Sequence, residues 1–565
     1  MHQLLQPESS FRRTLSSKVV RTAIAALITL SLFLTFYWKA DSLPDFRSSF
    51  KDAIEQPAGD PLTEFEPPAP IGNGRGRLHL LVPATSSNVD LCKLMVSAQI
   101  LGYPTPVLIN FGDDEEEDPY VQHLGKVEGL LEYLERLEDS SDYDTDLVLI
   151  VDGYDVWFQL RPDVLIKRYY EVVKQADARV KKIYGEEVAE SNGMTHSIVI
   201  GPDKVCWPVD FSRPACWAVP GTTLSRYAFG PQSHNGRDDN NDPKWLNSGT
   251  IIGPAQDLKE FLQATLDLIH EDPSVTSDQY YMAQLFGLQE FARLSHNQTR
   301  MHEFRDTRYN VELEHPDDTG LMRFEPSIKA DVKTEYHILI DGESSLFQTL
   351  AFWKQYLTFM TPSHSWFPKR NGTNITDPTI FNPYHAEIPS DIDASTKPLN
   401  LSSNDISRTL SWSQTELLYN TISHRFPVLI HFTGEKKYRD VWWQRMWFQS
   451  SAAELRQASA KLLDYGITAD GERIDGKTWV KAESQHAEEY REAGISGAES
   501  DRRGWLSWRT MCGIHEGALY EQRDQTRFFH PVAPPPPEEE EEADIFPLQA
   551  STPDAADEPA ADAGG

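Results

Sequence analysis

Two aspartates at the end of an apolar segment are the strongest candidates for chemistry in this chain. Residues 147–151 read Leu-Val-Leu-Ile-Val, Asp152 and Asp155 follow, and bulky apolar residues resume at Val156. A buried strand with this pattern carries both carboxylates to its carboxyl end, which is where parallel α/β sheets bind ligands. Carboxylate oxygens suit Mg²⁺ or Mn²⁺. The pair therefore predicts a divalent cation site, although an ordinary surface turn uses the same residue types.

The overall charge constrains what such a site can bind. The chain has 565 residues, with 53 Lys and Arg against 86 Asp and Glu, for a net charge of −33. So acidic a protein lacks the basic surface that nucleic-acid binding needs, and no nucleic-acid partner is expected. An anionic ligand would need a local cation, and a metal ion bridging a diphosphate would supply one. The length excludes a disulfide-stapled miniature protein.

The elements that must position the aspartates alternate along the chain. Short apolar runs predict strands, and stretches with helical periodicity separate them. This alternation predicts an α/β fold, with a mostly parallel, Rossmann-like sheet flanked by helices. The expected strands are 78–82, 106–110, 147–151 and 197–200, and the expected helices are 90–101, 121–137 and 163–175.

The N-terminus predicts a membrane anchor. Residues 22–38 carry no charge, and four basic residues precede them. Their length suits a thin bilayer, and the basic flank predicts a cytosolic tail (1–21). The rest of the chain would then be lumenal, and the protein would be a single-pass type II protein of the Golgi or ER membrane. A stem (39–75) would separate its body from the bilayer. A cleaved signal peptide and a buried soluble helix are the alternatives.

The C-terminal part contains two regions of different composition. Residues 441–530 are rich in Trp and have a mainly helical pattern, which predicts a helical extension packed on the body. Residues 531–565 contain a proline run followed by a glutamate run and no Lys or Arg. Such a composition predicts a disordered acidic tail.

In the predicted lumenal location, sequons could be glycosylated and cysteines could form disulfides. Four sequons are present, at Asn297, Asn371, Asn374 and Asn400. The last three lie in a predicted insertion at 361–407. All four are candidates for glycosylation. Cys206 and Cys216 are close in sequence and could form a disulfide in an oxidising compartment, or remain two buried thiols.

The Asp-x-x-Asp segment resembles the metal motif of metal-dependent glycosyltransferases of the GT-A type. Over about residues 78–440, an ordered set of segments also resembles the glycosyltransferase domain of the procollagen-lysine hydroxylase/glycosyltransferase family. These segments are Val82-Pro-Ala-Thr85, Cys206-Trp-Pro208, Trp245-Leu-Asn-Ser-Gly249, Ser277-Asp-Gln279, Asp341-Gly-Glu-Ser344 with Phe347-Gln348, and Ile430-His431 with Gly434 and Lys436. The iron-binding pattern of the hydroxylase half is not found.

The resemblance implies a role for each matching residue around the cation. Asp152, Asp155 and His431 would be the protein ligands of Mn²⁺ (or Mg²⁺). Gly434 would let the backbone approach the diphosphate, and Lys436 would add positive charge. The nucleoside would lie against Pro83 and Thr85.

On the sugar side, the resemblance implies a second group of contacts. Asn247 and Gly249 would shape the sugar pocket, although a β-bulge would also explain this segment. Asp278 would contact the sugar or acceptor hydroxyl as the catalytic residue, supported by Gln279, or would simply cap a helix. Trp207 would stack on a sugar or pack in the core. The acidic run that precedes Asp-Gln in the family is absent here at 271–277.

The resemblance therefore implies a metal-dependent hexosyltransferase. It would use a nucleotide diphosphate sugar, expected to be UDP-linked, and a hydroxyl of a protein or glycan acceptor in the secretory pathway. A non-catalytic, lectin-like or scaffold protein on a decayed transferase fold is the alternative from another class. A metal-dependent phosphatase or nuclease would usually need a denser cluster of acids and histidines than the sequence contains.

Overall fold

The computed structural model describes residues 74–521, except 113–118, 139–142, 144–145, 302–325, 329–331, 363–368, 371–372, 375–385, 397–410, 461–465 and positions 211, 234, 298, 470 and 494. The predicted cytosolic tail, membrane span and acidic tail lie outside the described residues, as does nearly all of the stem. Asn371 and Asn400 also lie outside them. Within the described part, no helix combines the length and apolar character needed to cross a bilayer.

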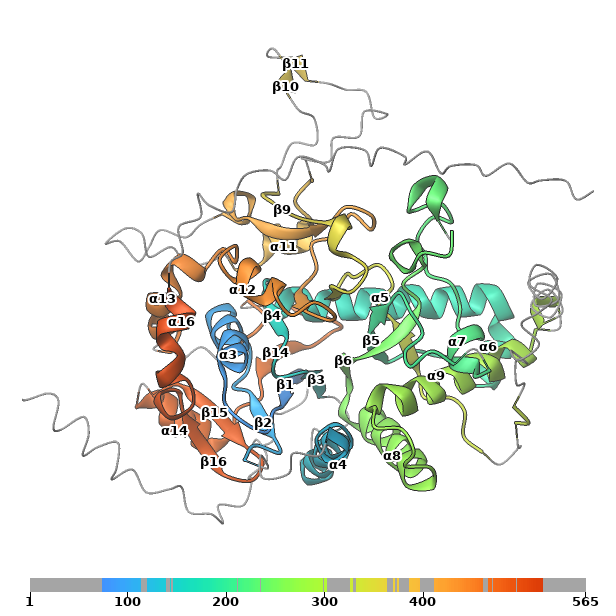
Figure 1. The fold of residues 1–565 in the computed structure, drawn as a ribbon, viewed down its shortest axis with the longest axis horizontal. Coiled ribbons are helices and arrows are strands. Elements are labelled where there is room, and N and C mark those ends of the chain that lie inside the picture. Colours follow the sequence, from blue (N-terminus) through green and yellow to red (C-terminus); the bar gives the residue numbers. More distant parts are fainter. Residues whose placement is uncertain are drawn as a thin grey trace, which may run out of the picture. The chain divides into compact units, whose positions relative to one another are not determined.

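The centre of the structure is a nine-stranded sheet in the order β16-β15-β2-β1-β3-β6-β5-β7, with β14 beside the first half of β1 (Figure 1). Only β6 and β16 pair antiparallel to their neighbours, so the predicted mixed α/β fold with a largely parallel sheet is confirmed. The strands are β1 (Arg75–Pro83), β2 (Val107–Ile109), β3 (Leu147–Val151), β5 (Ile198–Asp203), β6 (Trp245–Pro254), β7 (Ile338–Ile340), β14 (Thr478–Lys481), β15 (Gly497–Ser500) and β16 (Gly504–Ser507).

Helices cover both faces of this sheet because each buried strand presents apolar side chains on both sides. Leu147 and Leu149 of β3 join the core cluster that contains residues of α3 and α5, whereas Val148 joins the cluster with α4, α8 and α9. This alternation follows from the two-residue period of a strand. The helices are α3 (Val89–Leu101), α4 (Pro119–Glu138), α5 (Pro162–Tyr184), α8 (Ala255–Glu271) and α9 (Asp278–Ser295).

A three-stranded sheet lies next to the carboxyl end of β3. Its central strand, β13 (Leu429–His431), pairs antiparallel with β4 (Val156–Phe158) and parallel with β8 (Phe347–Thr349). The remaining strands form two antiparallel pairs: β9 (Leu357–Met360) with β12 (Leu417–Asn420), and β10 (Lys369–Arg370) with β11 (Thr373–Asn374). The short helices are α6 (Glu186–Ser191), α7 (Pro214–Trp217) and α11 (Ser390–Ala394).

The prediction of a mainly helical extension after residue 440 misses the strands of this region. This region has helices α12 (Tyr438–Trp443), α13 (Ala452–Ala460), α14 (Gln485–Glu492), α15 (Trp508–Cys512) and α16 (Glu516–Tyr520), but it also gives β14, β15 and β16 to the central sheet. Its packing against the body, which was also predicted, is confirmed by Trp443 and Trp479, each at most 1% exposed. Without this region β1 and β2 would present unpaired backbone groups; β14 pairs with β1, β15 pairs with β2, and β16 pairs with β15.

Two disulfides are present, one across a short loop and one between distant parts of the chain. The expected Cys206–Cys216 bond closes the loop after β5. A second bond, which the sequence did not indicate, joins Cys92 in α3 to Cys512 in α15 across 420 residues. This bond ties the C-terminal region to α3, the helix that follows β1.

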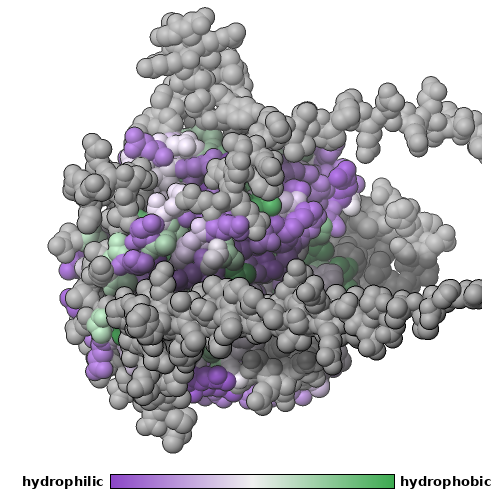
Figure 2. Space-filling model, turned by 60° about the vertical axis from the view of Figure 1, so that its left-hand side comes forward, coloured by the Kyte–Doolittle hydropathy of each residue, from purple (hydrophilic) through white to green (hydrophobic). Residues whose placement is uncertain are grey.

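On the face drawn in Figure 2, hydrophilic residues cover most of the described surface, and hydrophobic residues are scattered between them. Among the large apolar side chains that are exposed, Trp207 and Tyr227 are 59% and 69% accessible. The core-packing interpretation of Trp207 is therefore wrong.

Glu499 of β15 should make the free energy of unfolding depend on pH. Burial, with Glu483 nearby, raises the pKa of Glu499 from 4.5 to about 7. Between these values the unfolded chain releases a proton that the folded protein keeps, so stability falls as pH rises from 4.5 to 7. We expect Glu499→Gln to match wild type near pH 4 and to exceed its unfolding free energy by about 3 kcal/mol at pH 8. Urea unfolding across this range checks this, and parallel pH profiles for both proteins would contradict it.

Candidate metal centre

The turn between β3 and β4 carries Asp152 and Asp155 at the carboxyl end of the parallel strands. The Asp152 amide donates to the Gly249 carbonyl oxygen of β6 at 2.9 Å, which ties the turn to the neighbouring strand. A Cβ on Gly153 would lie 2.7 Å from the carbonyl oxygen of Pro83. The turn therefore passes directly against the end of β1, and only glycine fits at this position.

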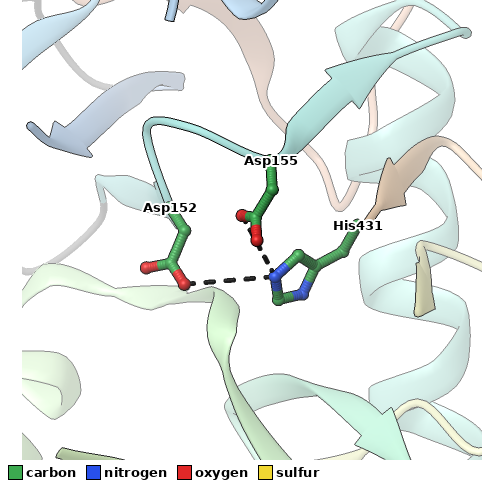
Figure 3. A group of neighbouring side chains, drawn as sticks. All are labelled: Asp152, Asp155 and His431. Carbon is green, nitrogen blue, oxygen red and sulfur yellow. Dashed lines mark ion pairs between the residues drawn. The ribbon is translucent and has the colours of Figure 1, made fainter. Parts of the chain in front are cut away.

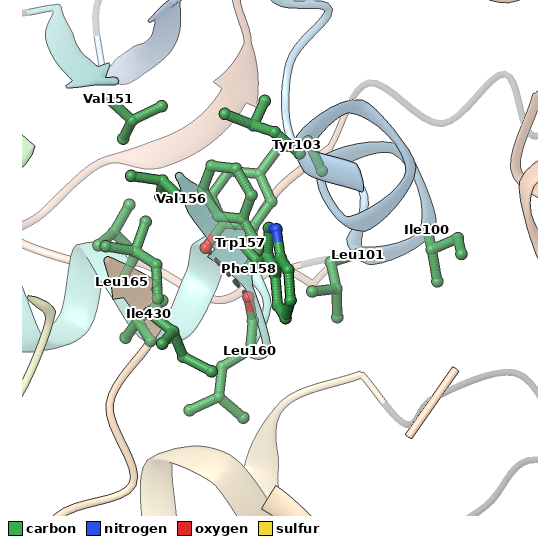
Figure 4. Close-up of a cluster of buried hydrophobic side chains, with 14 of the residues drawn as sticks. Ile100, Leu101, Tyr103, Val151, Val156, Trp157, Phe158, Leu160, Leu165 and Ile430 are labelled. Atoms are coloured by element: carbon green, nitrogen blue, oxygen red, sulfur yellow. Dashed lines mark hydrogen bonds between the residues drawn. The ribbon is translucent and has the colours of Figure 1, made fainter. Parts of the chain in front are cut away.

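Strand β4 anchors the other side of the turn. Its three residues, Val156, Trp157 and Phe158, are completely buried. Trp157 and Phe158 pack among the side chains around α3, where the Tyr103 hydroxyl donates to the Leu160 carbonyl oxygen at 3.0 Å (Figure 4). Burial of each large apolar side chain stabilises this arrangement by about 2 to 3 kcal/mol. Asp155 is thus held in place by the fully buried strand that follows it.

His431 reaches the aspartates because β13 pairs with β4. The register places His431 opposite Val156, next to Asp155, and the imidazole is 3% exposed. Its Nε2 lies 3.3 Å from Asp155 Oδ1 and 4.0 Å from Asp152 Oδ2 (Figure 3). The ligand atoms of these three residues all lie within 4.8 Å of one another. The sequence-based grouping of the three residues is therefore confirmed.

Two further observations show that this group could hold a metal ion. A Cβ on Gly249 would lie 2.2 Å from His431 Cε1 and 2.6 Å from Asp152 Oδ2, so the space between the ligands exists because residue 249 has no side chain. In addition, Asp155 Oδ1 is buried and has no well-formed hydrogen bond to another described residue. A cation would satisfy this oxygen.

Lys436 adds positive charge at the exposed side of the group. Its Nζ lies 2.7 Å from Asp155 Oδ2, and its side chain is 52% exposed. Burial alone would raise the pKa of Asp155, but His431 and Lys436 outweigh it and hold this pKa well below the usual range. Asp155 is consequently an ionised carboxylate at neutral pH.

A buried lysine that the sequence analysis missed connects the metal group to Asp278. Lys126 of α4 lies 2.9 Å from Asp152 Oδ1 and 2.7 Å from Asp278 Oδ2. Burial alone would lower the pKa of Lys126, but the two carboxylates raise it, so the ammonium is charged. No motif surrounds Lys126, and its mid-helix position gives no local signal of this role.

Asp278 occupies a different position from the predicted cap. It is the first residue of α9, and Ser277 is the residue at the N-cap. Asp278 is 5% exposed and faces Lys126. The interpretation of Asp278 as a helix cap is thus wrong, and its carboxylate belongs to the same charged group as Asp152.

The predicted sugar-side residues are also brought together. The Asn247 amide accepts from the Gly249 N–H at 3.2 Å, and Gln279 links the Ser248 N–H (3.4 Å) to the Trp207 carbonyl oxygen (3.4 Å). The bulge interpretation holds as well, because the β5–β6 register shifts between Ile200 and Gly201, opposite this segment. Buried Asp203, which accepts from Asn247 at 3.3 Å, was not predicted.

The predicted nucleoside residues lie at the end of β1. Pro83 is its last residue, and the Thr85 hydroxyl lies 3.4 Å from that of Tyr154, which also accepts from the Ser86 N–H at 2.9 Å. Gly434 has a positive φ of 74°, which favours glycine at the turn that leads from His431 to Lys436.

The glycosylation sites remain predictions. Asn297 is partly exposed after α9, and Asn374 belongs to strand β11.

No protein-family model matches this chain, and a search of curated proteins finds no significant match.

Removing Lys126 should lower the free energy of unfolding, and removing the Asp278 charge as well should make this loss smaller. Lys126→Met leaves two carboxylates without their shared cation, and we expect it to lower the unfolding free energy by about 3 to 5 kcal/mol. Adding Asp278→Asn should recover part of this loss because one uncompensated charge disappears. Urea unfolding of both variants checks the expectation. A double variant no more stable than Lys126→Met would show that the three charges do not act together.

Proposed function

We propose that this protein is a metal-dependent glycosyltransferase of GT-A-like architecture. It transfers a hexose from a nucleotide diphosphate sugar, expected to be UDP-linked, to a hydroxyl of a protein or glycan. The observation that carries the proposal is the group of Asp152, Asp155 and His431, which lies at the carboxyl end of the parallel sheet beside the β1 loop. This is the edge at which such sheets bind nucleotides.

The residues around the group suit a diphosphate leaving group. When bound there, Mn²⁺ or Mg²⁺ would offset the negative charge that develops on the departing phosphate. Lys436, half-exposed beside Asp155, would reach a phosphate oxygen from the solvent side. The backbone at Gly434 has no side chain to obstruct that approach.

The opposite side of the group suits a sugar and its acceptor. Trp207 offers an exposed aromatic face, and its carbonyl oxygen is held by Gln279. Asp278 would accept a hydrogen bond from a sugar or acceptor hydroxyl, and Lys126 orients its carboxylate. Asp278 is therefore our candidate for the catalytic carboxylate.

The two disulfides support the proposed lumenal location, because such bonds persist in oxidising compartments. We propose that the protein is a single-pass type II protein of the Golgi or ER membrane.

The alternatives explain the site less well. A decayed, lectin-like protein would be expected to lose metal ligands, yet all three are adjacent here. A two-metal phosphatase or nuclease usually holds its ions in a denser cluster of acids and histidines than the three-residue group found among the described residues.

Removing one ligand charge should abolish metal-dependent transfer while the fold survives. Asp155→Asn keeps the side-chain volume, and we expect Mn²⁺-dependent sugar transfer to fall by about 100-fold or more. Nucleotide affinity should weaken in Mn²⁺ and change little in chelator. His431→Ala should behave alike, and the double variant should lose little more, because one ion would be the shared cause. Transfer and hydrolysis assays with a panel of nucleotide sugars check this.

Two matched variants sharpen the test. Asp267→Asn makes the same change on the exposed face of α8 and should have no effect. Lys436→Ala should weaken nucleotide binding with or without metal, since its charge would act on the phosphate directly. Full Mn²⁺-dependent transfer by Asp155→Asn would refute the proposed function.

A further inference from the structure

The turn between β15 and β16 places the C-terminal region at the same edge of the sheet as the metal group. β15 pairs in parallel with β2, with Ser500 opposite Leu108, so the turn at Asp501–Arg503 lies beyond the carboxyl end of β2. The Asp501 N–H donates to the Leu108 carbonyl oxygen at 3.1 Å, and Asp501 Oδ2 accepts from the Asn110 N–H at 3.0 Å. The turn is therefore fixed to the loop after β2.

Two arginines of this turn contact that loop. Arg502 Nη2 donates to Asn110 Oδ1 at 3.0 Å, and Arg503 Nη2 donates to the Gly112 carbonyl oxygen at 2.9 Å. A Cβ on Gly112 would lie 2.0 Å from the Arg503 guanidinium, so this guanidinium rests directly on the backbone. The Gly112 N–H in turn donates to the Thr85 carbonyl oxygen at 2.7 Å. Arg503 is thus separated from the predicted nucleoside loop by one residue.

The spacing between the turn and the metal group suits a nucleotide. The order β15-β2-β1-β3 puts three strand spacings, about 14 Å, between the end of β15 and the end of β3 that leads to Asp152. A nucleoside diphosphate held by its phosphates near Asp152 would extend past β1 and place its base near the end of β2. Pro83 and Thr85 lie between these two points.

The guanidinium of Arg503 can form the hydrogen bonds and stacking contacts that a nucleobase accepts. The Arg503 side chain is exposed, and its guanidinium donates to the Gly112 carbonyl oxygen. A guanidinium has five N–H donors in one plane, so it can donate to base carbonyl oxygens and stack on the base. Positive charge at this edge would also favour an anionic ligand on a chain with a net charge of −33.

We infer that the β15–β16 turn forms the base-binding end of the nucleotide-sugar site and that Arg503 contacts the nucleobase. This inference rests on the proposed function and extends it, because it assigns part of the donor site to the C-terminal region. Arg502 acts as a positioning residue, since it donates to Asn110 in the loop after β2.

The test compares ligands with and without a base. Binding of UDP and of pyrophosphate, each with Mn²⁺, is measured by calorimetry on the full chain and on Arg503→Ala. We expect the variant to weaken UDP binding by about tenfold or more and to leave pyrophosphate binding unchanged. Arg473→Ala is the matched control, because Arg473 also donates to a carbonyl oxygen, that of Gly476. Arg473 precedes β14 and therefore lies at the amino ends of the parallel strands, away from the metal group.

The outcomes separate the inference from the proposed function. The inference is overturned if Arg503→Ala binds UDP as tightly as the wild-type protein, or if the variant loses UDP and pyrophosphate affinity equally. Either result leaves the proposed function standing. If the wild-type protein binds neither ligand in Mn²⁺, the proposed function fails and the inference fails with it. Thermal unfolding confirms that the variant is folded, which the exposed position of Arg503 leads us to expect.

Discussion

The close approach of β6 to the ends of β3 and β13 is the constraint on which the rest of the site depends. At Gly249 the backbone passes so near His431 and Asp152 that a single methyl group would overlap both. This approach exists because β6 runs beside β3 and bulges opposite β5, while β13 is held against the fully buried strand β4. The three strands bring together candidate ligands almost 280 residues apart in the sequence. The backbone, rather than any one ligand, creates the space for an ion.

Charge explains how so acidic a chain could accept a diphosphate. The carboxylates of Asp152, Asp155 and Asp278 would repel a phosphate if they stood alone. Lys126 neutralises the buried side of this group, and Lys436 faces solvent on the other side. Arg503 adds a cation farther along the same edge. Positive charge therefore surrounds the acids at a few fixed points, although the net charge of the chain is −33.

The parts of the fold that the sequence predicted are those with strong local patterns. The apolar run at 147–151 and the aspartates that follow it predicted a cation site at this turn but left an ordinary surface turn open, and the ordered set of motifs pointed to His431. The strands β14 and β15 were missed because they are four residues long, and their stability comes from pairing with β1 and β2 some 400 positions away in the sequence. Lys126 and the Cys92–Cys512 disulfide were missed for the same reason, since tertiary contacts leave no local pattern.

The central claim is that one divalent cation is bound by Asp152, Asp155 and His431 and in turn binds the diphosphate of the donor. Pulsed electron paramagnetic resonance of the Mn²⁺-loaded protein tests this directly. The account predicts a nitrogen coupling from a directly bound imidazole that disappears in His431→Ala, and a phosphorus coupling that appears when UDP is added to the wild-type protein. A wild-type spectrum with no nitrogen coupling, or one that UDP leaves without a phosphorus coupling, would contradict it.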